Sequence, residues 1–321
     1  MKTTEPLLID AVITWVDGKE PKHKDKIQKY LKDKTVLNSK ELTNRFNQVN
    51  EIEYCVKSIL KYAKFVRTIY IVTDKQVPAF LTENSHLYPT VKIVDHTEIF
   101  RDHLEYLPTF NSRSIETLLY KIPNLSEHFI YLNDDTFFLK ETKIEDFFIN
   151  QQPILRGFWK TFNEDIFIKK LKYVFQKKSK TKRPSHKLAQ ETGAKVFGFK
   201  KYYKFHHIAH PIRKSSLATF FDNNKEILEK NIKYKFRNIE QFTIQSLANH
   251  LEIKNKTGVL LNDYQLIYFQ NYKKPFFWLK SKLEKAKNTQ TKLFLCMQSL
   301  DVCPPNKLVF IKDWLHKKYN V

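Results

Sequence analysis

The chain has 321 residues, of which 42% are hydrophobic and 14% aromatic, enough for a buried core in one large or two ordinary domains. Its five glycines argue against a Gly-rich phosphate loop and against a fold built from repeated tight turns. The net charge of +22 predicts an anionic partner: nucleic acid, an acidic membrane surface or a phosphate-rich substrate. A Lys-rich, solvated surface without a specific partner explains the charge equally well.

Cysteine content and hydropathy indicate a cytoplasmic protein. Cys55, Cys296 and Cys303 form no metal-ligand pattern, and their odd number does not suit a disulfide framework. The first residues lack the features of a secretory signal peptide. No apolar run approaches the ~20 residues that span a bilayer. We therefore expect any membrane contact to be peripheral.

The first half of the chain alternates strand and helix patterns. Strands are predicted at 7–16, 66–73, 91–94 and 128–132, and helices at 49–63 and 113–121. The polar residues 19–44 are expected to form a surface excursion. This order predicts an α/β fold with a mostly parallel sheet and flanking helices.

The second half is more basic and mainly helical. Residues 169–183 hold eight basic and no acidic side chains. Helical stretches are expected at 206–220, 224–253 and near the end of 292–320. We therefore divide the chain into an α/β core, residues 1–150, and a helical, basic part, residues 151–321, that packs on the core.

Acidic residues follow three of the predicted strands. Asp17, Asp74 and the pair Asp134–Asp135 come directly after apolar runs. Ligands of open α/β sheets bind at the carboxyl ends of the strands, so these carboxylates are expected to meet at one edge. The adjacent pair suits a divalent cation on a pyrophosphate, or a general base for an acceptor hydroxyl. Each aspartate alone is more typical of a turn or a helix cap, and only the three together favour a site.

A basic, histidine-rich segment is the second candidate. His207 and His210 are three residues apart and would share one face of a helix, a spacing that suits zinc although no third ligand is evident. Arg213 and Lys214 favour an anionic ligand instead. Surface histidines on a basic helix are an equally good interpretation, and the same holds for His206.

Arg237, followed by Glu240 and Gln241, is a third candidate. An isolated arginine between apolar helical stretches can clamp a phosphate. Such a residue is more often exposed or part of a structural salt bridge.

Four segments together resemble the Stealth family of sugar-1-phosphate transferases. The first is residues 9–18, IDAVITWVDG. The second runs from Arg45-Phe46 through the acidic motif Asn133-Asp134-Asp135 and keeps its order and spacing over more than 100 residues. Looser similarity covers residues 207–241 and 294–301, where Gln298-Ser299 replaces the Asn-Asp that the family often shows. The family includes bacterial capsule enzymes and the animal N-acetylglucosamine-1-phosphotransferase.

The resemblance implies a fold, a site and a reaction. The fold would be a nucleotide-sugar-binding core over residues 1–150, glycosyltransferase-A-like or Rossmann-like, with an active site that residues 151–321 complete. The protein would be bacterial and cytoplasmic, with peripheral contact at the inner face of the membrane. The resemblance also implies transfer of a hexose or N-acetylhexosamine 1-phosphate from a UDP-sugar to a hydroxyl of a growing anionic capsule glycan, with release of UMP. Position by position, it implies the roles that follow. Trp15, Asp17, Gly18, Asn111, Asn133 and Gln298 would bind the nucleotide sugar; Asp134, Asp135, His207 and Arg237 would be catalytic; and Asp135 with Asp17 would hold Mg²⁺ or Mn²⁺. Either Asp134 or His207 would take the proton of the acceptor.

Two rival interpretations remain open at this point. A conventional metal-dependent glycosyltransferase would share the fold, the donor and the metal but would release UDP. A nucleic-acid-binding protein would suit the charge and the aromatic content, although no binding motif is present and acidic residues stand at the strand ends. We expect no nucleic-acid partner, and contacts with the inner membrane or the capsule assembly machinery instead.

Overall fold

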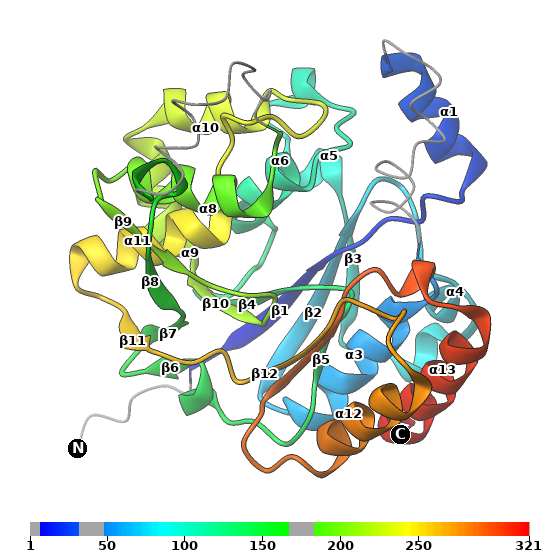
Figure 1. The fold of residues 1–321 in the computed structure, drawn as a ribbon. Helices are drawn as coiled ribbons and strands as arrows, with labels where there is room; N and C mark the ends of the chain where they lie inside the picture. Colours follow the sequence, from blue (N-terminus) through cyan, green and yellow to red (C-terminus); the bar gives the residue numbers. More distant parts are fainter. Residues whose placement is uncertain (1–6, 32–47, 167–182, 321) are drawn as a thin grey trace, which may run out of the picture.

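A five-stranded sheet runs through the middle of the protein in a computed structural model that describes residues 7–31, 48–166 and 183–320 (Figure 1). The strands are β1 (Ile9–Thr14), β2 (Val66–Thr73), β3 (Val91–Asp95), β4 (His128–Asn133) and β10 (His210–Arg213). Their order is β10-β4-β1-β2-β3, and all pairs are parallel except β10 with β4. The expected α/β class with a mostly parallel sheet is therefore confirmed.

The apolar runs form strands because both faces of the sheet are buried. Successive side chains of a strand point to opposite faces, so each run supplies two cores. In β4, Ile130 and Leu132 pack with the helices on one face, whereas Phe129 and Tyr131 pack with those on the other. The alternation in β1 and β2 is the same, which explains why these strands are mostly apolar.

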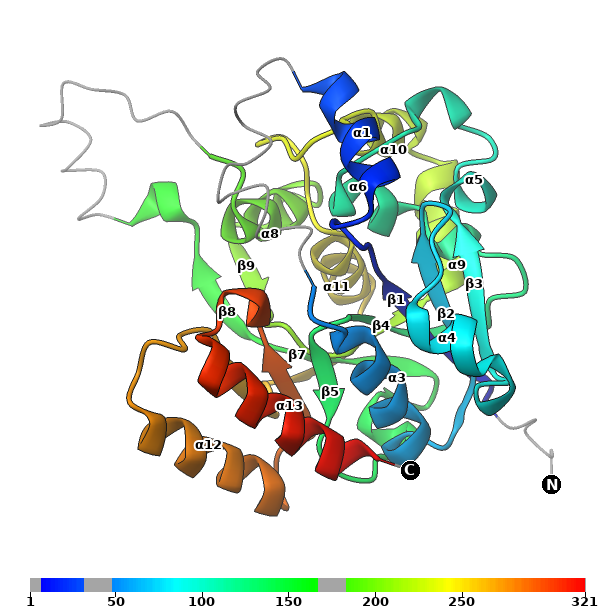
Figure 2. The same cartoon turned by 90° about the vertical axis from the view of Figure 1, so that its right-hand side faces the viewer.

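Helices cover both faces of the sheet (Figures 1 and 2). On one face lie α3 (Glu51–Tyr62), α12 (Phe276–Asn288) and α13 (Pro305–Tyr319). Their counterparts on the other face are α6 (Ser112–Thr117), α9 (Lys214–Asp222), α10 (Lys225–Ile232) and α11 (Ile244–Asn255). The remaining α-helices are α1 (Pro21–Tyr30), α4 (Ala79–Asn84), α5 (His96–Ile99) and α8 (His186–Lys195). Short 3₁₀ turns span Ser85–Leu87, Leu104–Tyr106, Leu119–Lys121, Ile144–Asp146, Asn163–Asp165 and Leu300–Val302.

The structure also contains three small sheets, two of which join the ranges 1–150 and 151–321. β5 (Thr136–Phe138) pairs with β13 (Phe294–Met297), which also pairs with β12 (Leu266–Phe269). β7 (Gln152–Arg156) lies between β6 (Phe148–Ile149) and β11 (Val259–Leu261). β8 (Phe158–Thr161) and β9 (Lys201–Lys204) form an antiparallel ribbon. The pairings of β5 with β13, of β6 with β7 and of β4 with β10 connect the ranges 1–150 and 151–321.

The predicted helix over 206–220 is wrong in its first half. Residues 206–209 form a loop, His210 begins the edge strand β10, and helix α9 begins only at Lys214. Pro211 suits an edge strand, where its missing N–H is not needed, and it would interrupt a helix at this position. His207 and His210 therefore do not share a helix face.

Three further segments differ from the secondary structure that the sequence predicts, or lie partly outside the described residues. The expected helix at 224–253 is two helices, α10 and α11, separated by a loop that carries Arg237. The surface excursion at 19–44 contains α1, and α12 was not predicted. The Lys-rich segment 169–183 lies outside the described residues except for Arg183. Within the described ranges, no helix combines the length and the apolar character needed to cross a bilayer.

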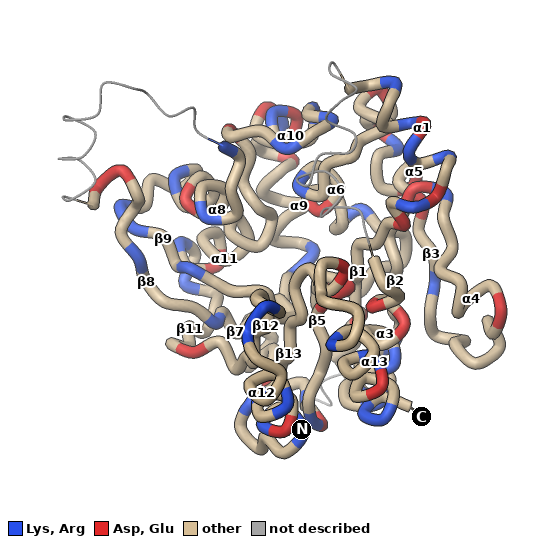
Figure 3. The backbone as a smooth tube through the Cα atoms, turned by 45° about the vertical axis from the view of Figure 1, so that its right-hand side comes forward, with Lys and Arg blue, Asp and Glu red and all other residues tan. Residues whose placement is uncertain are grey.

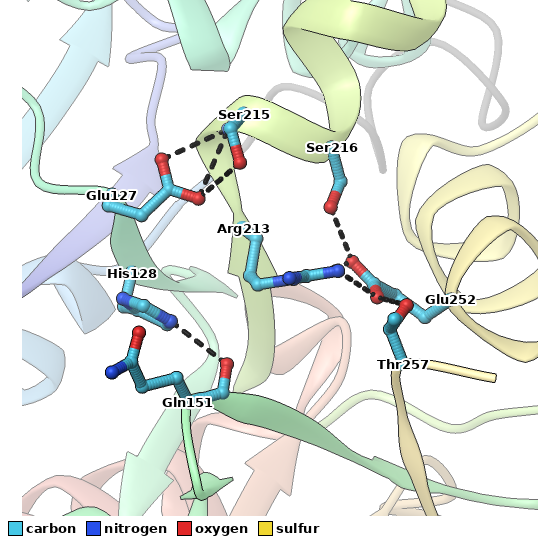
Figure 4. A network of polar contacts seen from close by, with 8 residues as sticks. All are labelled: Glu127, His128, Gln151, Arg213, Ser215, Ser216, Glu252 and Thr257. Carbon is cyan, nitrogen blue, oxygen red and sulfur yellow. Dashed lines mark hydrogen bonds and ion pairs between the residues drawn. The ribbon is translucent and has the colours of Figure 1, made fainter. Parts of the chain in front are cut away.

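Arg213 and Lys214 serve the fold rather than an anionic ligand. The Arg213 guanidinium donates two hydrogen bonds to the Glu252 carboxylate, at 3.0 and 2.6 Å (Figure 4). Lys214 donates through its backbone N–H to the Glu127 carbonyl, at 2.8 Å. The Glu127 carboxylate also accepts from the Ser215 N–H and hydroxyl, where a negative charge favours the beginning of α9. These contacts fasten α9 to α11 and to the segment before β4.

Candidate active site

A pocket of about 360 Å³ lies at the carboxyl ends of the parallel strands. Residues that follow β1, β2, β3 and β4 form its floor, and its walls come from α3, α6, α8, α11 and the loops after β9, α10 and β13. The residues that line it are Thr14, Trp15, Val16, His23, Glu51, Val72, Asp74, His96, Thr109, Phe110, Ser112, Arg113, Ile115, Glu116, Asn133, Asp134, Asp135, His186, His207, Arg237, Thr243, Gln245, Gln298, Ser299 and Asp301. All four predicted catalytic residues, Asp134, Asp135, His207 and Arg237, are therefore in one pocket.

The acidic pair occupies the turn between β4 and β5. The turn is held from the second half of the chain, because the Met297 N–H donates to the Asp135 carbonyl at 3.0 Å. Burial raises the pKa of Asp134 well above its usual range, and the charges of Asp135 and Glu51 add to this effect. Burial likewise raises the pKa of Asp135, while the nearby His207 opposes the shift. The two carboxylates therefore repel each other when both are ionised, and a bound cation would reduce this repulsion.

Two further carboxylates, those of Glu51 and Asp301, lie with Asp134 and Asp135 in the pocket, and the four are called the acidic cluster below. Glu51 stands at the first position of α3, and its pKa is raised by burial and, to a smaller extent, by Asp135 and Asp301. The sequence did not single out Glu51 or Asp301 as site residues. Each lies in a segment on which the family resemblance rests, and this position could have identified them as site residues.

The acidic cluster suits a hard divalent cation in its chemistry. Carboxylate oxygens are the ligands that Mg²⁺ and Mn²⁺ prefer, and Mg²⁺ is commonly held by one or two carboxylates together with substrate phosphates. Among the described residues, no group of three or more His, Cys, Asp or Glu side chains is arranged so that it could hold a metal ion. A cation at this cluster would therefore need ligands besides these side chains, such as the phosphates of a bound substrate.

His207 is placed by the loop between β9 and β10. Its backbone N–H donates to Nδ1 of His206, at 2.9 Å. Its ring stacks on His186 with 4.9 Å between centroids and lies parallel to Tyr268 at 5.9 Å. Burial lowers the pKa of His207, Asp135 opposes that shift and Arg237 adds to it. A neutral imidazole in this position is able to accept a proton near neutral pH.

Arg237 lies on the loop between α10 and α11. Its Nη2 donates to Ser112 Oγ at 2.9 Å, where α6 begins, and its charge partly offsets the burial that raises the pKa of Glu116. The loop is fixed by Gln241, which is fully buried and donates to the carbonyl of Asn231 at 2.7 Å. Glu240 is exposed and accepts from the Tyr234 hydroxyl. Arg237 is therefore the member of this group that faces the pocket.

The predicted nucleotide-sugar residues divide into two sets. Trp15, Asn133 and Gln298 line the pocket, and the Asn133 amide oxygen is held by the Tyr131 hydroxyl at 2.9 Å. Asn111 is fully buried beneath α6, where it caps the Arg113 N–H and donates to the Tyr234 carbonyl. Asn111 thus positions the loop of Arg237 and does not itself line the pocket.

Asp17 and Gly18 also lie outside the lining of the pocket. The Asp17 carboxylate accepts from the Lys19 N–H at 2.9 Å, and its backbone N–H donates to Gln76 Oε1 at 2.9 Å. The residues just before it, Thr14 to Val16, form the pocket wall instead. The Asp17 carboxylate is hydrogen-bonded within the turn after β1. That Asp17 and Asp135 together bind a metal therefore stays a prediction.

Three buried polar atoms in the pocket wall have no hydrogen-bond partner among the described residues. They are Trp15 Nε1, Thr243 Oγ1 and Gln245 Oε1. A buried polar atom without a partner costs about 1–3 kcal/mol, so such atoms normally have a partner. Their position in the pocket indicates that a polar ligand supplies it. Sequence reasoning missed Thr243, Gln245 and His186, because helices α11 and α8 reach the pocket only through tertiary packing.

The fold and the pocket define an α/β protein with a polar ligand site at the carboxyl ends of its parallel strands, the usual ligand site of such sheets. Stealth protein conserved region 1 matches residues 9–35, and conserved region 2 matches residues 45–155. Residues 9–155 therefore carry two conserved regions of Stealth proteins.

Similar curated proteins carry names from polysaccharide synthesis. The chain is 49% identical over 145 residues to the capsular polysaccharide phosphotransferase fcs1 of Haemophilus influenzae, a match that covers 44% of this chain and 38% of that protein. It is 44% identical over 149 residues to cps1A of Actinobacillus pleuropneumoniae, covering 46% and 40%. For LcbA of Neisseria meningitidis the identity is 43% over 145 residues, covering 44% and 38%. The chain thus spans about two fifths of the length of these relatives.

Two solved structures resemble the chain distantly. Mouse xyloside xylosyltransferase 1 matches 90% of this chain and 97% of its own, with a TM-score of 0.40 and 9% identity. The glycosyltransferase GlyE of Streptococcus pneumoniae TIGR4 matches 97% of this chain and 62% of its own, with a TM-score of 0.40 and 10% identity.

Proposed function

We propose that this protein transfers a hexose 1-phosphate or an N-acetylhexosamine 1-phosphate from a UDP-sugar to a hydroxyl of a growing capsule glycan. The product is a phosphodiester, and UMP is the leaving group. The observation that carries the proposal is the convergence of Asp134 and Asp135 with His207 and Arg237 in one pocket. The names of the relatives, which are capsular polysaccharide phosphotransferases, point to the same chemistry.

The proposed reaction is an in-line displacement at the phosphorus that carries the sugar. The acceptor oxygen forms a new bond to this phosphorus, and the bond to the bridging oxygen breaks, so that the electron pair leaves with UMP. Such reactions depend mainly on positioning and on neutralising phosphate charge. Arg237, oriented by Ser112, would stabilise the equatorial phosphate oxygens as charge develops.

The acceptor proton needs a base at the same phosphorus. His207 is poised for this role because its lowered pKa keeps the imidazole neutral near pH 7. Asp134 is the other candidate, although its raised pKa favours the protonated form. These pKa shifts support His207 as the base. Asp134 would then act with the other carboxylates of the acidic cluster and not as the base.

Mg²⁺ or Mn²⁺ would be held by Asp135 and its neighbours in the acidic cluster, and when bound it would screen the charge of the pyrophosphate. The cluster gives a reason to expect this ion, because four carboxylates otherwise repel each other in a buried site. Arg237 and the neutral His207 lie in the same pocket. They provide a cation and a base at the reacting phosphorus.

The identity of the released nucleotide tests the proposal. The protein would be incubated with UDP-N-acetylhexosamine, Mg²⁺ and a short capsule-type primer, and UMP would be separated from UDP. UMP release that needs primer and is abolished by a chelator is the expected result. UDP release would instead identify a conventional glycosyltransferase, in which attack occurs at the sugar carbon, and would remove His207 and Arg237 from their proposed roles.

A further inference from the structure

A row of five aromatic rings leads from the pocket to the β8–β9 ribbon. It starts at His207 in the pocket, and its other members are Tyr268, His206, Tyr264 and Phe158. Successive centroids are 5.9, 4.4, 5.4 and 5.1 Å apart in that order. His206 also lies 5.6 Å from His207, so the three inner rings form a cluster from which Tyr264 and Phe158 lead outward. Three separate parts of the chain supply these rings: β8, the loop after β9, and the segment from Tyr264 into β12. This set is called the aromatic row below.

The aromatic row is accessible along its length. Phe158 is 36% exposed at its outer end, and Tyr264 and Tyr268 are partly exposed. A large apolar side chain on the solvent side of a two-stranded ribbon contributes little to a core. Tyrosine and histidine rings combine an apolar face with a polar edge, a combination that suits ligands with both apolar and hydroxylated surfaces.

A positive charge accompanies the outer half of the row. Lys204 of β9 is the direct cross-strand partner of Phe158, so the two side chains leave the ribbon on the same face. The carbonyl of Lys204 accepts from the Tyr264 hydroxyl at 3.3 Å, and its ammonium group adds to the lowering of the His206 pKa that burial causes. Lys and Arg also mark the neighbouring parts of β8 and β9 (Figure 3).

We propose that the aromatic row and Lys204 form the acceptor track, on which the preceding sugars of a phosphodiester-linked glycan lie while its terminal hydroxyl reaches His207. The inference rests on the proposed function for the identity of the acceptor. Sugar rings present C–H faces that stack on aromatic rings, and the phosphodiesters of such a glycan complement Lys204. The row meets the pocket at the proposed base, which links the track to the reacting phosphorus.

Exposed aromatic rings beside lysines are also typical of surfaces that stack nucleic-acid bases. The placement argues for the glycan, because the row ends on the side chain that would deprotonate a sugar hydroxyl. Single-stranded nucleic acid is therefore included as a competing ligand in the experiment.

Binding of labelled probes to the full chain tests the acceptor track by fluorescence anisotropy. The probes are a phosphodiester-linked N-acetylhexosamine hexasaccharide, an uncharged N-acetylglucosamine hexasaccharide and a single-stranded oligothymidylate. We expect Phe158→Ala and Tyr264→Ala to weaken binding of both glycans about tenfold each, the order typical of one lost aromatic contact. Tyr264→Phe should bind like the wild type, because it keeps the ring. Lys204→Gln should weaken binding of the charged glycan alone.

Phe277→Ala is the matched control, since Phe277 is 74% exposed on α12 and lies outside the row. Wild-type affinity in Phe158→Ala and in folded Tyr264→Ala, or no glycan binding by the wild type, would overturn the acceptor track. Tighter binding of oligothymidylate, lost in the same variants, would assign the row to nucleic acid instead.

The two proposals can fail separately. UMP release onto a single-sugar acceptor, together with glycan binding that ignores Phe158 and Tyr264, would retain the phosphotransfer and reject the track. Release of UDP, together with glycan binding that depends on the row, would retain the track and reject the phosphotransfer.

Discussion

The Arg237 guanidinium donates to Ser112 Oγ at 2.9 Å, although 125 residues separate the two in sequence. Ser112 is the first residue of α6, and Asn111 before it is tied to Tyr234 and Gln241 on the loop that carries Arg237. The loop and the helix are therefore joined at two points. Arg237 is held toward the pocket by the fold itself.

Replacing Arg237 should therefore affect turnover more than stability. We expect Arg237→Ala to lower kcat by about 100-fold or more, an order typical of losing one electrostatic stabiliser of a transition state. Ser112→Ala keeps the guanidinium and removes the hydrogen bond that its Nη2 donates to Ser112 Oγ, so a loss of up to about tenfold is expected. Steady-state UMP release from variants with wild-type thermal unfolding gives the measurement. Near-normal turnover of Arg237→Ala would remove the residue from the mechanism.

The acidic cluster predicts a metal effect that is visible without turnover. If Asp135 helps to hold Mg²⁺, millimolar Mg²⁺ should raise the melting temperature of the wild type by about 2–4 °C, because ligand binding stabilises the folded state. Asp135→Asn should lose this response and lower kcat by about 100-fold or more. Asp313→Asn changes a surface carboxylate of α13 and serves as the control, with an unaltered Mg²⁺ response. A full response in Asp135→Asn would place the ion elsewhere.

The parallel strands were predictable from the sequence because each is buried on both faces. The apolar runs at 66–73 and 128–132 coincide with β2 and β4 almost residue for residue, since little but apolar packing is required of them. The strand β10 was not predictable in this way. It has four residues, and its partner β4 lies 79 residues earlier at the closest pairing, His210 with Tyr131.

Without the family resemblance, which also indicated His207 and Arg237, the site was predictable only where the chain itself marks it. Asp134 and Asp135 interrupt an apolar sequence at a strand end, a local pattern that is typical of a site and equally of a solvated turn. Thr243, Gln245 and His186 have no such local mark. They become pocket residues because α11 packs against α8 and α6, an arrangement that depends on contacts far apart in sequence.

The unpartnered hydroxyl of Thr243 predicts a ligand contact. Thr243→Val keeps the shape of the side chain and removes an oxygen that has no partner in the described residues. Stability should therefore stay the same or rise by up to about 1 kcal/mol, whereas UDP-sugar binding should weaken about tenfold through loss of one hydrogen bond. Calorimetric titration and chemical unfolding measure the two effects.

Thr117 provides the matched comparison for Thr243. It is equally buried, but its hydroxyl donates to the Arg113 carbonyl at 2.6 Å and accepts from Asn231 at 2.7 Å. Thr117→Val should cost about 1–3 kcal/mol of stability because it removes a partner from both Asn231 and Arg113. Equal losses of stability in Thr243→Val and Thr117→Val would show that the Thr243 hydroxyl has a hydrogen-bond partner within the protein and does not need one from a ligand.

The free energy of unfolding should fall as the pH is lowered, because His250 is buried in its neutral form. The ring is fully buried: its Nδ1 donates to the Ser246 carbonyl at 2.7 Å, and its Nε2 accepts from the Tyr203 N–H at 2.9 Å. Burial lowers the pKa of His250 from 6.5 to about 4, and the bond to Ser246 opposes the shift. A second proton would have to be placed on Nε2, facing the Tyr203 N–H.

The sign of the effect follows from linkage. Between pH 6.5 and pH 4 the unfolded chain binds a proton at His250 that the folded chain does not, so this contribution to stability is present above pH 6.5 and is lost as the pH falls. From pH 7 to pH 5 the loss from this group is about 2 kcal/mol. His250→Gln can still accept from Tyr203 and does not titrate, so its free energy of unfolding should change by about 2 kcal/mol less over that interval. Identical pH dependence in urea unfolding of the two proteins would mean that His250 titrates normally in the folded state, with its two hydrogen bonds broken in solution.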